Sequence, residues 1–262
     1  MVMVNIRRFF SLGTAFAVLA LFETIQLRPT AVVMAAVGAL LLVAGIVKVF
    51  FKAAPDLSKK ERLAYRLALA AVPLFLIWSA LAFELLVERA LARQALGLLV
   101  AALTALFFES MVMYEKNPSV FKGYSLENLG GYTATLAIFL GVSALLGMRL
   151  LLGLNIAFVA ALFILLISLL THSIFWFSGL RGSSASVTVW VVALLGFELF
   201  LVFNILPLYF MASGAILTVC WYVGVMLSRT QLLNLMTKKI LYRHLGFGGA
   251  LLAVLLLTAE WL

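Results

Sequence analysis

The chain has 262 residues, of which 66% are hydrophobic and 11% are charged, and its formal net charge is +9. A soluble domain carries about 25% charged residues, which it needs to cover its surface. A mean hydropathy of +1.20 therefore excludes a soluble domain and indicates an integral membrane protein. The positive charge does not predict nucleic-acid binding, because the bases fall in short gaps between apolar runs, where they determine topology.

A helix needs about 20 mostly apolar residues to cross a bilayer. Nine segments approach this length, so we expect an all-α polytopic membrane protein with a single integral membrane domain, residues 1–262. The predicted spans are residues 9–27, 31–51, 67–87, 95–113, 131–147, 150–173, 187–208, 212–227 and 245–262. Only the tripeptide "MRL" separates the fifth span from the sixth, so eight spans with one long broken helix is the alternative.

The first and third predicted spans each carry an acid near the end that we expect to be the outer one. Glu23 is followed five residues later by Arg28, and Glu84 is followed five residues later by Arg89. An acid at such a depth can reach the membrane interface or pair with a nearby base. Both acids are also candidates for binding a substrate or a proton.

Two basic gaps between the predicted spans are longer than a turn. They read "APDLSKKERLAYR" at residues 54–66 and "LLNLMTKKILYRH" at residues 232–244. Both suit short interfacial helices that lie on anionic head groups. The bases expected to bind anionic lipids are Lys59, Lys60, Arg62, Lys238, Lys239 and Arg243. Recruitment of a partner subunit, or self-association, is the alternative use of these gaps.

The seventh predicted span contains the most isolated acid, Glu198, in the run "LGFELFLVFNILP". A charge at the centre of a bilayer costs roughly 2.5–3.5 kcal/mol on insertion scales, and less near the interface. Glu198 must therefore be protonated, paired with a base from another helix, or exposed to a water-filled cavity. Bases expected on the same side of the membrane that could pair with it include Arg28, Arg89 and Arg149.

The end of the seventh span also carries Asn204 and Pro207, which predict a distorted helix end with backbone carbonyls that need new partners. Two interpretations of the polar residues follow. In the first, Glu198, Glu84, Glu23 and Asn204 line a cavity that binds a substrate or protons. In the second, the acids form a static ion-pair cluster that joins the helix ends.

The acids at the expected outer ends recur along the chain at Glu23, Glu84, Glu198 and Glu260, and the first two and last two are each about one helical hairpin apart. An ancestral hairpin duplication would produce this pattern. Simple stacking of hairpins would produce a similar period, and the third unit has no acid near residues 141–143. We therefore expect either a duplicated hairpin or a simple stack of unrelated hairpins.

The distribution of Lys and Arg predicts the orientation. The amino terminus and the gaps after the second, fourth, sixth and eighth spans hold 15 bases, whereas the remaining gaps hold 4. Because cytoplasmic loops are enriched in Lys and Arg, we expect the amino terminus in the cytoplasm and, with nine spans, the carboxyl terminus outside.

Motifs for nucleotide hydrolysis, zinc proteolysis and serine-hydrolase chemistry are absent from the sequence. Cys220 is the only cysteine and Asp56 the only aspartate, so neither a thiolate metal site nor paired aspartates can form. We therefore expect no catalytic, cofactor-binding or metal-binding residue.

The last third of the chain resembles the carboxyl-terminal portion of an uncharacterised multi-span membrane protein family of genome-reduced candidate-phylum bacteria. The likeness rests on the order Glu198, Leu206-Pro207, Gly214, Trp221-Tyr222, Arg229, a basic amphipathic turn and the closing "LLTAEW". The resemblance implies a bacterial cytoplasmic membrane and no particular site residue.

The leading functional expectation is a non-enzymatic transporter or binder of a small or amphiphilic molecule that uses the outer-half carboxylates. A membrane scaffold or assembly subunit is the second, and a lipid-modifying enzyme the third. The sequence favours the first two because it offers no residues for conventional catalysis.

Overall fold

The structure is a computed structural model that describes the backbone of residues 2–50, 59–116 and 124–259 and the side chains of residues 11–49, 61–114 and 126–259. The described chain is helical, without strands. It divides into two compact units, Met1–Ala137 and Ile138–Leu262. The helices are α1 (Val2–Leu27), α2 (Val32–Phe50), α3 (Lys59–Glu84), α4 (Ala90–Lys116), α5 (Tyr124–Leu152), α6 (Ile156–Phe177), α7 (Ser183–Phe203), α8 (Phe210–Leu232) and α9 (Lys238–Thr258).

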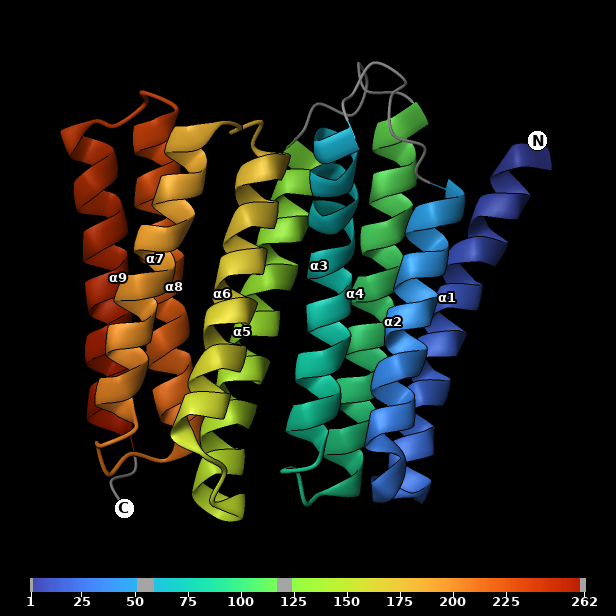
Figure 1. Ribbon diagram of the computed structural model, residues 1–262, viewed down its shortest axis with the longest axis horizontal. Coiled ribbons are helices and arrows are strands. Elements are labelled where there is room, and N and C mark those ends of the chain that lie inside the picture. The colour runs from blue at the N-terminus through green and yellow to red at the C-terminus, as the bar shows by residue number, and fades with distance from the viewer. Residues whose placement is uncertain (1, 51–58, 117–123, 260–262) are drawn as a thin grey trace. The chain divides into compact units, whose positions relative to one another are not determined.

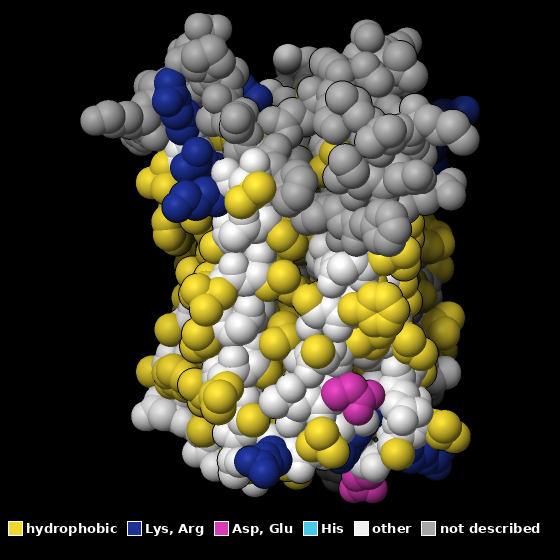
Figure 2. Space-filling view, turned by 90° about the vertical axis from the view of Figure 1, so that its right-hand side faces the viewer, with side chains coloured by type: hydrophobic (Ala, Val, Ile, Leu, Met, Phe, Trp, Pro, Cys, Tyr) yellow, Lys and Arg dark blue, Asp and Glu magenta, His cyan; other side chains and the backbone are white. Residues whose placement is uncertain are grey.

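Eight helices within the described residues are long and apolar enough to cross a membrane, and α1 adds a shorter apolar segment at Ser11–Leu27. Figure 2 shows hydrophobic side chains through the middle of one face, with Lys and Arg toward both ends. This distribution matches a hydrocarbon slab bounded by two polar interfaces. The predicted all-α, polytopic membrane architecture is confirmed.

The first unit is a bundle in which α1 packs against α2 and α4, and α3 packs against the same two helices. A short 3-10 turn at Pro29–Ala31 links α1 to α2. Phe22 of α1 is buried and lies against Gly97 of α4, where a Cβ would come within 3.3 Å of its ring. The small residue thus allows the two helices to approach closely.

The second unit contains the end of α5 and the helices α6 to α9, with α6 on α7, α7 on α8 and α8 on α9. The Phe163 and Phe200 rings stack between α6 and α7 with their centroids 4.4 Å apart. The buried Trp221 indole of α8 donates a hydrogen bond of 2.9 Å to the Thr171 hydroxyl of α6. Hydrogen bonds of this kind satisfy polar groups where no water is present.

The turn between α5 and α6 corrects the position of a predicted boundary. The sequence placed a break at the tripeptide "MRL", but α5 continues through these residues to Leu152. The chain turns instead where Gly153 adopts a left-handed conformation (φ 65°) and the Asn155 side chain caps α6 by accepting from the Ala157 amide. Met, Arg and Leu are good helix formers, whereas Gly and Asn favour this turn. Two helices therefore replace the alternative of one long broken helix.

The prediction of separate interfacial helices in the two basic gaps is wrong for the described residues. Lys59 to Arg66 form the first turns of α3, and Lys238 to His244 form the first turns of α9. At a rise of 1.5 Å per residue, a helix of 26 residues such as α3 is longer than the hydrocarbon core. A continuous helix can therefore place its basic first turns at the interface without a break. Residues 54–58 and Glu260 lie outside the described residues.

Gly214 of α8 is held against Ser143 of α5. A Cβ at Gly214 would overlap the Ser143 hydroxyl oxygen and lie 3.1 Å from its backbone Cα, whereas a Cβ at Gly224 of the same helix would meet nothing within 4 Å. We expect Gly214→Ala to lower stability by about 1–3 kcal/mol through overpacking. Gly224→Ala should be neutral or stabilising by up to about 1 kcal/mol.

Thermal unfolding of the two variants in detergent micelles tests this contact. Because Ser143 supplies the overlapping atom, Ser143→Gly combined with Gly214→Ala should recover part of the loss in a double-mutant cycle. Equal unfolding midpoints for the two single glycine variants would contradict the close approach of α5 and α8.

Candidate functional site

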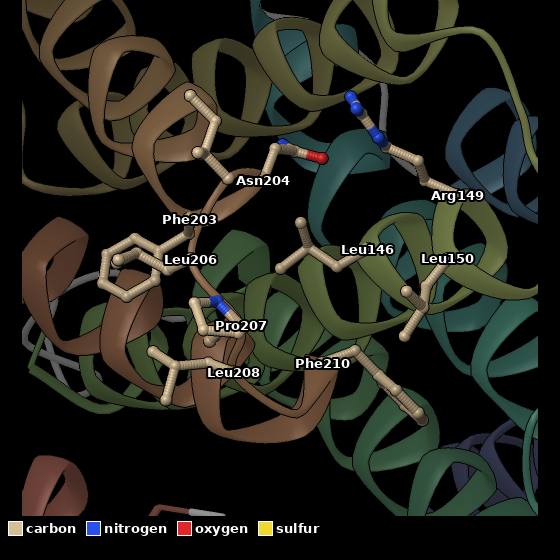
Figure 3. A pocket seen from close by; sticks show the side chains of 11 residues that line it. Leu146, Arg149, Leu150, Phe203, Asn204, Leu206, Pro207, Leu208 and Phe210 are labelled. Carbon is tan, nitrogen blue, oxygen red and sulfur yellow. The ribbon is translucent and has the colours of Figure 1, made fainter. Parts of the chain in front are cut away.

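A cavity of about 320 Å³ lies within the second unit, between the end of α5, the connection from α7 to α8, and the start of α8. Figure 3 shows the side chains that surround it. Its lining residues are Leu146, Arg149, Leu150, Phe203, Asn204, Ile205, Leu206, Pro207, Leu208, Phe210 and Ser213. Most of these are apolar, and the lining includes one charged side chain and no acid.

The cavity exists because the chain leaves the helical conformation between α7 and α8. The α7 helix ends at Phe203, and α8 begins only at Phe210. Pro207 has no backbone N–H, so it cannot continue a helix, and the Asn204 side-chain amide donates to the Phe200 carbonyl over 2.7 Å at the helix end. The predicted distortion at the end of the seventh span is confirmed.

Arg149 supplies the charge of the cavity. It lies in the last turn of α5, and its spacing of three from Leu146 places both on the cavity side of the helix. The residue is half-buried, and its guanidinium Nη1 atom is buried with no hydrogen-bond partner in the described structure. In Figure 3 the Asn204 amide oxygen points to the side of the cavity where Arg149 lies.

Ser213 adds a hydroxyl group that the sequence analysis did not single out. Its side chain is 1% exposed and lines the cavity, and its Oγ has no hydrogen-bond partner in the described structure. A serine in a membrane helix usually bonds to its own backbone, so the sequence carried no signal for this residue. Together with Arg149 it forms a polar corner in an otherwise apolar cavity, an arrangement that can hold an amphiphilic molecule.

Glu198 does not line this cavity. Its side chain is exposed on α7, on a surface that it shares with exposed Leu194, Leu195 and Val202. Within the described residues, no ion pair joins it to Arg149, its predicted partner from the same unit. The structure thus places Asn204 in the cavity and Glu198 outside it.

Glu84 lies in the first unit and is 1% exposed. Its Oε1 accepts a hydrogen bond of 2.9 Å from the Gln26 side-chain amide of α1, while its Oε2 is buried without a hydrogen bond in the described structure. The charges of Arg93 and Glu23 lie close enough to act on this carboxyl group. Glu84 therefore links α3 to α1 through a residue, Gln26, that sequence analysis left out.

The other predicted residues of the first unit lie at its surface. Glu23, Arg28 and Arg89 are exposed. Arg93 is half-buried and donates from its Nε to the Val87 carbonyl within the α3–α4 connection. The structure thus brings Glu23 near Glu84, and the common hairpin origin of the acids stays a prediction.

Within the part of the chain that is described, no group of three or more His, Cys, Asp or Glu side chains is placed to hold a metal ion. No family model, curated protein or solved structure matches the chain. The cavity geometry is therefore the basis for any functional assignment.

The hydrogen bond between Gln26 and Glu84 predicts a measurable contribution to stability. Glu84→Ala should cost about 1–3 kcal/mol, because it leaves the Gln26 amide without its partner and removes a buried side chain. Glu84→Gln should cost less, since an amide oxygen can still accept from Gln26. Glu88→Ala is the matched control, because Glu88 is exposed and should change stability by less than about 0.5 kcal/mol.

Chemical or thermal unfolding in micelles gives these values, and Gln26→Ala completes the double-mutant cycle. A positive coupling energy between the two positions is expected. The assignment fails if Glu84→Ala is no more harmful than Glu88→Ala.

Proposed function

We propose that this polytopic membrane protein binds a small amphiphilic molecule in the second-unit cavity without chemically changing it, as a carrier or transporter. The observation that carries the proposal is an apolar cavity with an unpartnered Arg149 nitrogen and an unpartnered Ser213 hydroxyl at a break between two helices. Its volume of about 320 Å³ falls within the range of small-molecule sites, about 300–1,000 Å³.

The connection between α7 and α8 supports the same proposal. The two helices are separate spans, and the residues that connect them, 204–208, line the cavity. Small-molecule sites in helical bundles commonly lie between the helices, with a few polar groups in an apolar lining. The arrangement therefore favours a binding role over a purely mechanical one.

Of the four predicted binding residues, Asn204 belongs to this proposed site. Glu84 has a proposed structural role in the first unit, because it already accepts a hydrogen bond from Gln26. Glu198 supports the alternative function, a membrane scaffold, since an exposed acid on an apolar helix surface suits contact with a partner that supplies a hydrogen-bond donor.

Tail-labelled diacylglycerol and tail-labelled phosphatidic acid, presented in nanodiscs, test the proposed function. Leu150 lines the cavity and is 57% exposed, so Leu150→Trp should obstruct the cavity without disturbing the core. We expect it to weaken binding of at least one probe by about tenfold or more. The matched control is Leu151→Trp, because Leu151 is its exposed neighbour and does not line the cavity.

If both variants keep the thermal stability of the wild-type protein, a loss of binding cannot be explained by unfolding. The carrier proposal fails if neither probe binds the wild-type protein above empty nanodiscs, or if the two Trp variants bind alike. Either outcome would favour the membrane scaffold.

We further propose that the protein resides in a bacterial cytoplasmic membrane with its amino terminus inside and its carboxyl terminus outside. The asymmetric distribution of bases supports this orientation. Lys238, Lys239 and Arg243 are exposed in the first turns of α9, where contact with anionic lipids of the inner leaflet would be favourable. The same role is proposed for Lys59, Lys60 and Arg62.

The orientation can be tested by replacing the native cysteine (Cys220→Ser) and then introducing single cysteines at exposed positions. A membrane-impermeant maleimide should label Leu152→Cys in intact cells, and it should label Leu235→Cys only after permeabilisation. Both positions are exposed at connections on opposite ends of α6 to α8. The reverse labelling pattern would show that the orientation is inverted.

A further inference from the structure

We propose that the second-unit cavity recognises an anionic head group, a phosphate or a carboxylate, through Arg149 and Ser213, while its apolar lining holds the attached hydrocarbon. This inference rests on the proposed binding function and names the class of ligand. Asn204 and the start of α8 complete the polar corner of the cavity.

The charge of the cavity lining is the first reason to expect an anionic ligand. Arg149 is its one charged residue, and no acid lies among the cavity-lining side chains. An arginine stays protonated in proteins and carries donors that match carboxylate and phosphate oxygens in pairs. A buried donor without a partner costs free energy, so the Arg149 Nη1 atom favours a ligand that brings acceptor oxygens.

The hydroxyl group of Ser213 is the second reason, and it is independent of the first. Thr218, in the same helix, donates its hydroxyl to the Gly214 carbonyl four residues earlier over 2.7 Å. Ser213 has no such bond, although it is 1% exposed and borders the cavity. Its donor therefore remains unused by the protein and is placed where a ligand oxygen can accept it.

The start of α8 is the third reason. The first turn of a helix has amide groups without partners inside the helix, together with a partial positive charge. No side chain caps this helix at Tyr209, and Phe210 and Ser213 of the first turns line the cavity. Anions bind readily at helix starts of this kind.

The neutral and cationic alternatives fit the cavity less well. A neutral head group would leave the guanidinium charge of Arg149 uncompensated in a site without acids. A cationic head group would meet Arg149 with no carboxylate in the lining to offset the repulsion, because Glu198 is absent from it. The charge balance therefore selects an anion.

Two tail-labelled probes that differ by one phosphate group, phosphatidic acid and diacylglycerol, separate head-group recognition from tail binding. The full-length protein in uncharged nanodiscs should bind phosphatidic acid about tenfold more tightly than diacylglycerol. Arg149→Gln should remove this preference, Arg149→Lys should restore part of it, and Ser213→Ala should reduce it severalfold. Arg89→Gln is the matched control, because Arg89 is an exposed arginine in the other unit.

Inorganic phosphate distinguishes a lipid head group from a free anion. Displacement of phosphatidic acid by phosphate, and not by sodium chloride at equal ionic strength, supports recognition of the anionic group itself. Saturable binding of phosphate alone would identify a soluble anion as the ligand, and binding only of the tailed probe would identify a lipid. Equal displacement by both salts would overturn the inference, because it would show only general screening.

The inference and the proposed function fail in different ways. If both probes bind equally and Leu150→Trp blocks both, the amphiphile site stands and the anionic preference is wrong. If Leu150→Trp affects neither probe, the proposed function falls, and the inference falls with it. Equal loss of the phosphate preference in Arg89→Gln and Arg149→Gln would also overturn the assignment to this cavity.

Discussion

The hydrocarbon interior of a bilayer offers no hydrogen-bond partners, and this constraint organises the whole chain. Every backbone amide and carbonyl that crosses the slab must be satisfied inside the protein, which explains why the described chain is helical. Some side-chain hydroxyls follow the same rule, as Thr188, Thr218 and Thr230 donate to carbonyls four residues earlier. Buried polar groups that have no partner in the protein therefore indicate where a ligand or water could bind.

Two sets of buried polar groups lack a full set of partners in the described structure, one in each unit, and their surroundings differ. In the first unit, Glu84 is buried, and one of its oxygens is already held by Gln26. In the second unit, Arg149 and Ser213 border a cavity and leave donor groups unused. A buried acid held by its neighbour is explained by helix packing, whereas donors that face a cavity need a ligand or water to satisfy them. The second arrangement is the one that suggests binding.

Hydropathy alone predicted the helical membrane class and the approximate spans, because length and apolar content determine whether a segment can cross a bilayer. It could not predict which face of a span points inward, since these helices are apolar on all sides and lack a marked polar stripe. Glu198 illustrates this limit: its isolation in sequence suggested an interior role, yet its side chain lies among exposed residues of α7. Gln26 and Ser213 were missed for the same reason, because their importance arises only from burial beside other helices.

Local backbone signals were more reliable for the ends of helices than for the residues of the site. Asn204 and Pro207 correctly predicted where α7 loses its regular form, because a missing N–H and a side chain that bonds the backbone act locally. Arg149 was assigned to a break between spans and considered only as an ion-pair partner. Its charge falls instead within the last turn of α5, where a positive side chain is also favoured by the helix dipole.

A close contact between α5 and α8 lies directly beside the cavity. Gly214 packs against Ser143, and the preceding residue, Ser213, lines the cavity. Because the glycine contact holds the two backbones at close range, the separation of the Ser213 hydroxyl from α5 is fixed by packing. The non-helical segment at residues 204–208 also lines the cavity, and the amides of Asn204, Ile205, Leu206 and Leu208 each donate to a nearby backbone carbonyl. The local backbone therefore satisfies its own donors there, whereas the Arg149 Nη1 atom and the Ser213 hydroxyl are left for a ligand.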